Sequence, residues 1–280
     1  MQKPGSHNVW LVLGETLNER NADVNDNKYK SRAARGEVQI GTWVNMIRSP
    51  GILTLLKAAG LDFVRVDMEH SPFSMETIAD MAALSRALDF PMVVRPPAGS
   101  REWIARLLDT GVWNLHVPQV DTPEQAHEVA KHSRYAPAGL RGMSGFGPNT
   151  DYESRPVVEH TAHANSQVHI TIMLESKQAF DHLDEIASVQ GIDALTLGPS
   201  DLAQDLGVLG RPDQQKVVNE YRERLVEAAR RHGKQVAFLA DSIDASRRMI
   251  ELGATIVTYS AEVAVLKNAY AAAVTEIRRK

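Results

Sequence analysis

Two acidic side chains follow two neighbouring apolar segments near the centre of the chain, and their spacing suggests metal chemistry. Glu175 follows the apolar run Ile170–Leu174, and Asp201 follows the run Ala194–Leu197 after Gly-Pro-Ser. The stretch between these runs has apolar residues at helical spacing, which predicts a strand–helix–strand unit with parallel strands. The C-terminal ends of the two strands then meet, and adjacent carboxylates repel unless a proton or a cation lies between them. A hard divalent cation with oxygen ligands fits this pair.

A second interpretation of this pair stays open at this point. Glu175 and Asp201 could simply begin two helices, since helix N-termini favour negative charge. Other reactive side chains also follow predicted strands, however. Asp67 and His70 lie at the end of one strand, and Arg95 ends the next. Barrel enzymes place their catalytic residues at strand ends, so this convergence favours an enzyme active site.

The elements that must position these residues alternate regularly along the chain. Apolar segments of strand length are predicted at residues 38–45, 62–67, 91–95, 112–117, 168–174, 192–197, 235–240 and 255–259. Amphipathic helices are predicted at residues 50–59, 74–88, 100–109, 213–232 and 261–279, with a further helix beginning at Thr122. Eight strands that alternate with helices predict an α/β fold, the (β/α)8 TIM barrel. An open doubly wound sheet is the alternative.

The N-terminal part differs from this alternating pattern. Residues 1–27 are polar and show no sustained period, which is typical of an extension, and Lys28–Gly36 is predicted to form one short helix. We therefore divide the chain into residues 1–35, the extension with its first helix, and residues 36–280, the catalytic barrel. Residues 134–167 are predicted to be one long irregular loop, the kind of connection that often carries function.

Composition narrows the possible functions. The formal net charge of the 280-residue chain is −4 at pH 7, so there is no basic surface to attract nucleic acid. No apolar run approaches the roughly 20 residues that a membrane span requires. The chain has no cysteine, which excludes disulfides, thiolate metal sites and a cysteine nucleophile. We expect a cytoplasmic protein without nucleic-acid or membrane partners.

From Gly41 to the C-terminus the chain resembles the HpcH/HpaI aldolase family, which includes 4-hydroxy-2-oxoheptanedioate and 2-dehydro-3-deoxyglucarate aldolases. The resemblance is carried by blocks that occur in the family's order: GTW (41–43), VDMEHSP (66–72), VVRPP (93–97), LLDTG (107–111), VPQVDTPEQA (117–126), RYAPAGLRG (134–142), LES (174–176) and LGPSDLAQDLG (197–207). It implies a (β/α)8 barrel that assembles as a homo-oligomer, a hexamer or trimer of dimers, in which the last helix is exchanged between subunits.

The resemblance also implies roles for the reactive residues. Glu175 and Asp201 match the family's metal-binding carboxylates, which would hold Mg2+ or Mn2+, or alternatively Co2+. Arg95 matches the arginine that contacts the 2-oxo acid and its enolate oxygen. His70 matches the proposed catalytic histidine, and Asp109 the acid paired with it. Two alternatives stay open: Arg95 could form a structural ion pair, and His70 could merely pack beneath the rim.

The predicted substrate pocket contains one departure from the family pattern. Asp67, Gly198, Pro199 and Ser200 match positions that line this pocket. Many members have glutamine two residues before the metal-binding glutamate, where this chain has Met173. We count Met173 among the substrate-binding residues and expect weaker pyruvate binding, because methionine offers only a weak acceptor.

These observations together predict a divalent-metal-dependent aldolase, a carbon–carbon lyase. It would cleave or form 4-hydroxy-2-oxo acids through a pyruvate enolate bound to the metal, with a small 2-oxo acid and an aldehyde as its partners. Imine chemistry is disfavoured, because Lys177 is the one lysine close to a strand end and it falls on the following helix. The alternatives on the same site are decarboxylation of oxaloacetate and a condensation like that of citrate synthase. A non-catalytic barrel is the third possibility.

Overall fold

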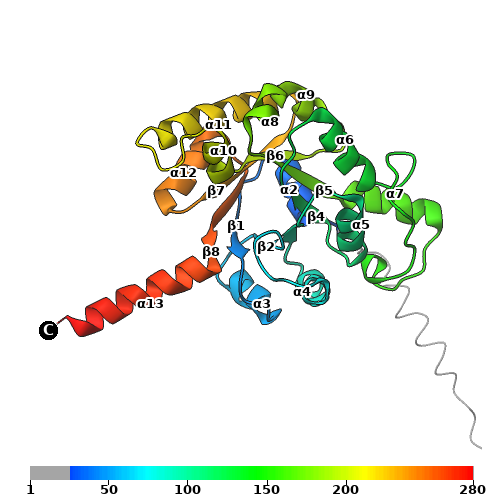
Figure 1. Cartoon of the computed structure of the whole chain (residues 1–280). Coiled ribbons are helices and arrows are strands. Elements are labelled where there is room, and N and C mark those ends of the chain that lie inside the picture. Colours follow the sequence, from blue (N-terminus) through cyan, green and yellow to red (C-terminus); the bar gives the residue numbers. More distant parts are fainter. Residues whose placement is uncertain (1–25, 280) are drawn as a thin grey trace, which may run out of the picture.

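The computed structural model describes residues 26–279. Eight parallel strands form one closed barrel in the order of the chain (Figure 1). This topology confirms the (β/α)8 barrel and excludes the open doubly wound sheet. The strands are β1 (Gln39–Val44), β2 (Phe63–Asp67), β3 (Met92–Arg95), β4 (Asn114–Val117), β5 (His169–Leu174), β6 (Ala194–Leu197), β7 (Gln235–Ala240) and β8 (Ile256–Ala261).

Helices connect the strands and cover the outside of the barrel. They are α2 (Lys28–Ala34), α3 (Gly51–Ala58), α4 (Met75–Ala87), α5 (Arg101–Asp109), α6 (Pro123–His132), α7 (Val157–Gln167), α8 (Lys177–Asp181), α9 (Leu183–Ser188), α10 (Pro199–Asp205), α11 (Gln214–Arg231), α12 (Ile243–Leu252) and α13 (Glu262–Arg278). Five of them, α2, α4, α6, α8 and α12, begin with side-chain caps. Ser74 accepts a hydrogen bond from the Thr77 amide, and Thr122 forms a capping box with Gln125.

Three connections differ from the sequence prediction. The predicted loop at residues 134–167 contains helix α7, whose sequence is mostly polar and therefore lacks an amphipathic pattern. Helix α12 was not predicted, and Met249 is its one fully buried residue. The single helix expected after β5 is divided into α8 and α9 at His182.

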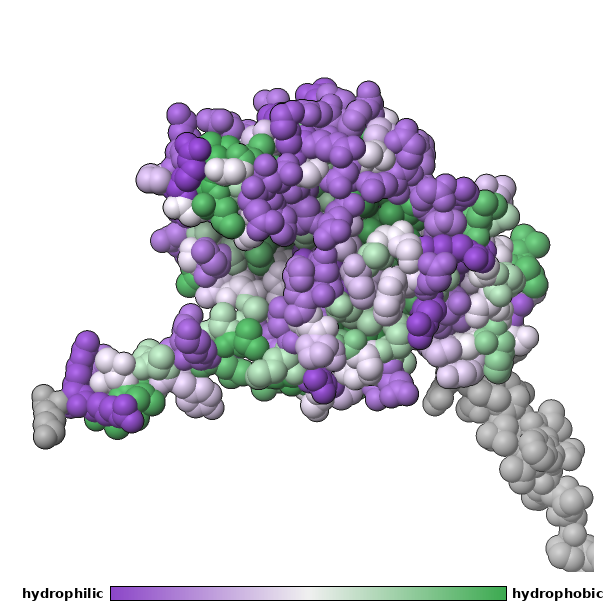
Figure 2. Space-filling view, in the orientation of Figure 1, coloured by the Kyte–Doolittle hydropathy of each residue, from purple (hydrophilic) through white to green (hydrophobic). Residues whose placement is uncertain are grey.

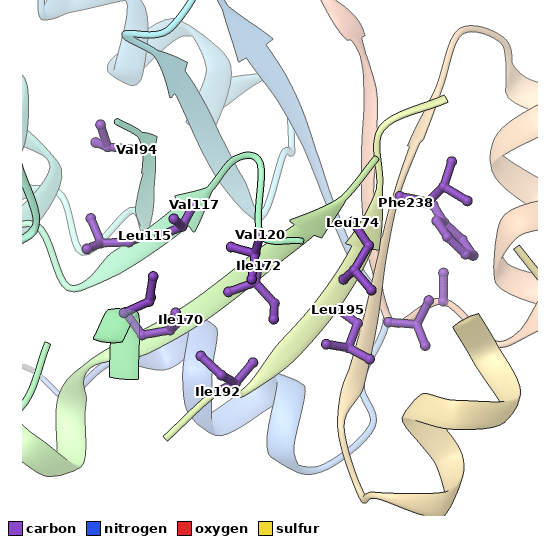
Figure 3. Packing of buried hydrophobic residues seen from close by; sticks show 14 of the residues in the cluster. Val94, Leu115, Val117, Val120, Ile170, Ile172, Leu174, Ile192, Leu195 and Phe238 are labelled. Atoms are coloured by element: carbon purple, nitrogen blue, oxygen red, sulfur yellow. The ribbon is translucent and has the colours of Figure 1, made fainter. Parts of the chain in front are cut away.

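The main hydrophobic core lies between the strands and the helices around them. Figure 3 shows apolar side chains of β4, β5 and β6 gathered there, among them Leu115, Ile170, Ile172 and Leu195. All four are fully buried. Each such side chain stabilises the fold by about 1.5–3 kcal/mol relative to exposure. This outer layer holds the strands rigidly and so fixes the positions of the side chains that face inward.

Helix α2 closes the barrel at the N-terminal ends of the strands. Tyr29 of α2 is fully buried and forms a second core inside the barrel with residues such as Phe63 and Ile256. Its ring meets those of Phe63 and His169 edge-on, with centroids 5.1 and 5.0 Å apart. The barrel interior is therefore packed at this end, and a cavity can open only toward the C-terminal ends of the strands.

Helix α13 extends away from the barrel (Figure 1). It carries exposed apolar side chains, and Figure 2 shows hydrophobic surface along it. These residues are Val265, Leu266, Tyr270, Val274 and Ile277. Within residues 26–279, no helix is both long enough and apolar enough to cross a membrane.

Candidate active site

A cavity of about 520 Å³ opens at the C-terminal ends of the strands. The predicted site residues that line it are His70, Arg95, Met173, Glu175, Gly198, Pro199, Ser200 and Asp201. Asp67 lies beside Arg95 on the adjacent strand, whereas Asp109 lies outside this cavity. The fold thus brings together nearly all of the residues that were selected from strand ends in the sequence.

Glu175 is the most perturbed acid of the site. Only 7% of the residue is exposed, and its Oε1 accepts a hydrogen bond of 2.8 Å from the backbone N–H of Gln119. Burial, together with repulsion from Asp201 and Glu69, raises the pKa of Glu175 to about 7, although the Gln119 hydrogen bond and Arg95 act to lower it. Crowded carboxylates of this kind are relieved by a bound cation.

Gly198 provides the space that Glu175 occupies. A Cβ atom at position 198 would lie 2.9 Å from the Glu175 Cβ and 3.1 Å from the Met173 Sδ, and would overlap the carboxylate itself. Only glycine therefore allows the end of β6 to approach these two side chains. Met173 and Glu175 both line the cavity, as expected for residues two apart on one strand.

Arg95 is held by two carboxylates. It forms a two-point interaction with Asp67, in which Nε–Oδ1 is 2.9 Å and Nη2–Oδ2 is 2.8 Å. Its third nitrogen, Nη1, lies 3.0 Å from Glu69 Oε2. The ion pairs considered from the sequence are therefore present. They also fix the guanidinium at the cavity wall, so a structural and a substrate-binding role are compatible.

His70 and Asp109 are not in contact within the chain. The side chain of His70 is 62% exposed, with Nε2 3.6 Å from Glu69 Oε2. Asp109 ends helix α5, and its Oδ1 accepts a hydrogen bond of 2.6 Å from Arg141 Nη2. The pairing of His70 with Asp109 stays a prediction, because the two residues are not in contact within one chain.

Sequence analysis missed several residues around the cavity. Gln119 forms hydrogen bonds to two acids. Its side chain donates to Glu69 Oε1 at 3.3 Å, and its backbone N–H donates to Glu175. Its φ of 55° lies in the left-handed region, a strained conformation that is common at functional sites. Arg65 and His116 line the inner part of the cavity. Arg65 did carry a signal, because a charged residue interrupts the apolar run from Phe63 to Val66 in strand β2.

The inner part of the cavity has an unusual electrostatic character. Arg65 and His116 are each 1% exposed. Burial, followed by repulsion from Arg65 and Arg95, holds the pKa of His116 well below its ordinary value. The His116 ring is therefore neutral near pH 7. The Trp43 ring lies between these groups, with Arg65 Cζ 5.3 Å and the His116 ring 5.7 Å from its centroid.

The donor set suits a hard divalent cation. In the part of the chain that the structure describes, no three His, Asp or Glu side chains gather into a complete metal-binding group. Glu175 and Asp201 instead form a pair that borders an open cavity. Mg2+ is commonly bound by one or two carboxylates, with substrate and water completing its coordination. The residues present therefore fit such an ion.

A closed (β/α)8 barrel with carboxylates and a fixed arginine around a cavity at the strand ends is typical of an enzyme. The chain belongs to the HpcH/HpaI aldolase/citrate lyase family, whose model matches residues 39–269. It is 36% identical over 253 residues to the 5-keto-4-deoxy-D-glucarate aldolase of Shigella sonnei, a match that covers 89% of this chain and 96% of that protein. The protein is therefore a carbon–carbon lyase, and its family depends on divalent metals.

Solved structures agree with this assignment. An HpcH/HpaI aldolase from Desulfitobacterium hafniense superimposes with a TM-score of 0.85 at 30% identity, covering 90% of this chain and 96% of that one. The citrate synthase SbnG is 25% identical, with a TM-score of 0.80 and coverage of 89% and 96%. One barrel thus serves more than one carbon–carbon bond reaction among similar proteins.

Proposed function

We propose that the protein cleaves and forms 4-hydroxy-2-oxo acids, with pyruvate as one product and a small aldehyde as the other. The observation that carries this proposal is the pair Glu175 and Asp201 beside Arg95 in one cavity at the strand ends. The 5-keto-4-deoxy-D-glucarate aldolases among its relatives support a sugar-acid-like substrate.

Glu175 and Asp201 are proposed to hold Mg2+ or Mn2+, with Co2+ as a possible substitute. When bound there, the ion supplies a Lewis acid that stabilises the enolate of a 2-oxo acid. The protein's own contribution is to keep the two carboxylates side by side. Gly198 leaves room for Glu175, and the Gln119 amide orients its Oε1.

Arg95 and His70 are proposed to act on the substrate. Arg95 places a fixed positive charge beside the oxygen that gains charge, and its bonds to Asp67 and Glu69 prevent reorientation during the reaction. His70 is proposed to move the proton of the hydroxyl group at the cleaved bond. Asp109 binds Arg141 in the chain, so its proposed pairing with His70 requires a neighbouring copy.

The remaining predicted residues are proposed to shape the 2-oxo acid site. Gly198 is the N-cap of helix α10 and Pro199 and Ser200 are its first residues, where the helix N-terminus favours a carboxylate. Met173 is proposed to contact the keto acid without a strong hydrogen bond. Condensation or decarboxylation of oxaloacetate is the second candidate, favoured by the similarity to the citrate synthase SbnG.

We also propose a homo-oligomer, a hexamer or trimer of dimers. The exposed apolar residues of α13 support it, because a projecting helix with such a surface gains stability when a second copy covers it. Sedimentation of the full chain and of Ile277→Asp would test this, with a smaller particle expected for the variant. A monomeric full chain would contradict the proposal.

The enolate chemistry has a direct test. Proton NMR of pyruvate in D2O should show deuterium entering the methyl group when enzyme and Mg2+ are present, and not after EDTA treatment. Glu175→Gln should behave like the EDTA-treated protein. Glu185→Gln, a change at an exposed glutamate of α9, is the matched control. Absence of exchange with Mg2+, Mn2+ and Co2+ alike would contradict the proposed function.

A further inference from the structure

Arg65 is a buried cation for which the described chain provides no acidic partner. It lies in the middle of β2, and its Nε and Nη2 atoms are buried without a hydrogen-bond acceptor within residues 26–279. Arg95 on the adjacent strand is different, since it binds both Asp67 and Glu69. An unpaired charge is costly to bury, so a guanidinium in this state is expected to have a partner that the protein itself does not supply.

The groups around Arg65 are aromatic or neutral, apart from Arg95, whose repulsion adds to burial in lowering the pKa of Arg65. Its Cζ lies 5.3 Å from the Trp43 ring and 5.7 Å from the Phe63 ring. Tyr29 approaches from below, but burial raises the pKa of its phenol, so Tyr29 is neutral near pH 7. Its Oη lies near Arg65 and Thr171 and interacts with both, although neither contact meets hydrogen-bond geometry. Aromatic faces stabilise a cation only partly, and they leave Nε and Nη2 of Arg65 without a hydrogen-bond acceptor among the described residues.

His116 provides a second free donor at the same place. It lies on β4, and neither ring nitrogen has a hydrogen-bond partner among residues 26–279. A neutral imidazole still carries one N–H that can donate to an oxygen anion. His116 and Arg65 line one cavity and contact the same Trp43 ring. A single ligand in this cavity therefore lies beside both side chains.

The position of this pair relative to the strand ends limits the size of that ligand. Arg65 precedes Asp67 by two residues, and Met173 precedes Glu175 by two. Two residues of a strand rise by about 6.6 Å, so Arg65 lies one layer deeper than Asp67, and Met173 one layer deeper than Glu175. A short chain with an acid group at each end can span this separation.

We propose that Arg65 and His116 form an inner subsite that binds the second carboxylate of a dicarboxylic 2-oxo acid. This inference rests on the proposed function, because that function places the 2-oxo end of the substrate at Glu175, Asp201 and Arg95. The second carboxylate enters past Met173, whose flexible apolar side chain does not compete for the donors. It then accepts charge-assisted hydrogen bonds from Arg65 and a neutral one from His116.

The test compares a dicarboxylate with a monocarboxylate of similar shape. Titration calorimetry of the full chain with Mg2+ should show succinate binding more tightly than propionate. In Arg65→Met this preference should fall by about 10- to 150-fold, the worth of a hydrogen bond to a charged group. Arg224→Met is the matched control, because Arg224 also stacks on aromatic rings but lies outside the barrel. It should keep the wild-type preference.

Thermal unfolding separates a binding role from a structural one. Succinate should raise the melting temperature of the wild type but not that of Arg65→Met. Without ligand, Arg65→Met should melt no lower than the wild type, because it removes an uncompensated buried charge. If Arg65→Met does not fold, Arg65→Lys and His116→Leu replace it, each with a smaller loss of preference. An unchanged succinate preference in these variants would overturn the inner subsite.

Failure of this inference is distinguishable from failure of the proposed function. Methyl exchange of pyruvate in the wild type tests enolate chemistry and does not depend on a second carboxylate. An Arg65-dependent succinate preference without exchange would keep the subsite and remove the aldolase proposal. Methyl exchange together with a succinate preference that does not depend on Arg65 would keep the aldolase proposal and remove the subsite.

Discussion

The two ends of the barrel interior treat buried polar groups in opposite ways. At the end closed by α2, several such groups bind each other. Asn27 donates to Asn114 Oδ1 at 2.7 Å, and Gln39 donates to the Tyr29 carbonyl at 3.0 Å. At the open end, carboxylates crowd together and Arg65 lacks a hydrogen-bond acceptor for two nitrogens within the described chain. At the closed end most of these groups bind each other, although Tyr29 Oη and Gln39 Oε1 have no partner among the described residues, whereas at the open end charged groups are left for a ligand to complete.

The largest expected effect comes from removing a carboxylate at the open end. Glu175→Gln and Asp201→Asn should each lower Mg2+ affinity and methyl exchange by more than roughly a hundredfold, because the proposed ion loses a charged ligand. Both variants should melt at or above the wild-type temperature. Titration calorimetry and calorimetric unfolding measure the two quantities. Unchanged Mg2+ binding in both variants would remove this half of the comparison.

Substitutions of His70 and Arg95 at the open end should affect the aldol and decarboxylation reactions differently. His70→Ala should lower aldol turnover by about 10²–10⁴-fold, the usual contribution of a general acid or base. Decarboxylation of oxaloacetate should suffer less, because it requires no proton transfer at a hydroxyl group. Arg95→Ala should lower both rates. Equal losses for His70→Ala in the two assays would argue against the proton-transfer role.

A substitution at the closed end should lower the stability of the protein and leave its reaction rate unchanged. Tyr29→Ala should lower the free energy of unfolding by about 3–5 kcal/mol, as for other large buried aromatic residues. The exchange rate per folded molecule should be retained. Phe146→Ala changes a residue that is 65% exposed and serves as the control, with an effect within about 0.5 kcal/mol. A chemical defect in folded Tyr29→Ala would show that the two ends are coupled.

The raised pKa of Glu175 makes cation binding depend on pH. Without a metal its carboxyl group is protonated below a pKa of about 7, and the proton then competes with the cation. Mg2+ affinity should therefore fall by up to about tenfold per pH unit as the pH drops below 7, and level off above it. Calorimetric titrations between pH 5.5 and 8.5 would measure this. A pH-independent affinity would contradict the assignment of Glu175.

The smallest effect is expected at Met173. Met173→Gln should lower the pyruvate KM by roughly 2- to 13-fold, because it restores one neutral hydrogen bond worth about 0.5–1.5 kcal/mol. Mg2+ affinity should change little. If the KM stays the same, residue 173 does not contact the keto acid.

The sequence was sufficient for the strands and for the residues that end them. Parallel strands align their C-terminal ends, so Arg95, Glu175 and Asp201 could be brought together before any coordinates were known. Helix α7 could not be predicted, because its polar sequence lacks amphipathic spacing. Partners that depend on three-dimensional placement were also hidden. Pattern alone gave no indication that Asp109 binds Arg141, or that Arg65 points into the barrel without an acid.

Glu262 joins the projecting helix α13 to the wall of the catalytic cavity. Its carboxylate accepts hydrogen bonds from the backbone N–H groups of Asn45, Met46 and Ile47 at 2.9, 2.7 and 3.2 Å. Asn45 itself lines the cavity. Helix α13 has 17 residues and is therefore about 25 Å long, and the hydrogen bonds of Glu262 attach its first residue to the barrel. A displacement of the far end of α13 is transmitted to the loop at Asn45. A contact that holds this end in place therefore also restrains one wall of the cavity.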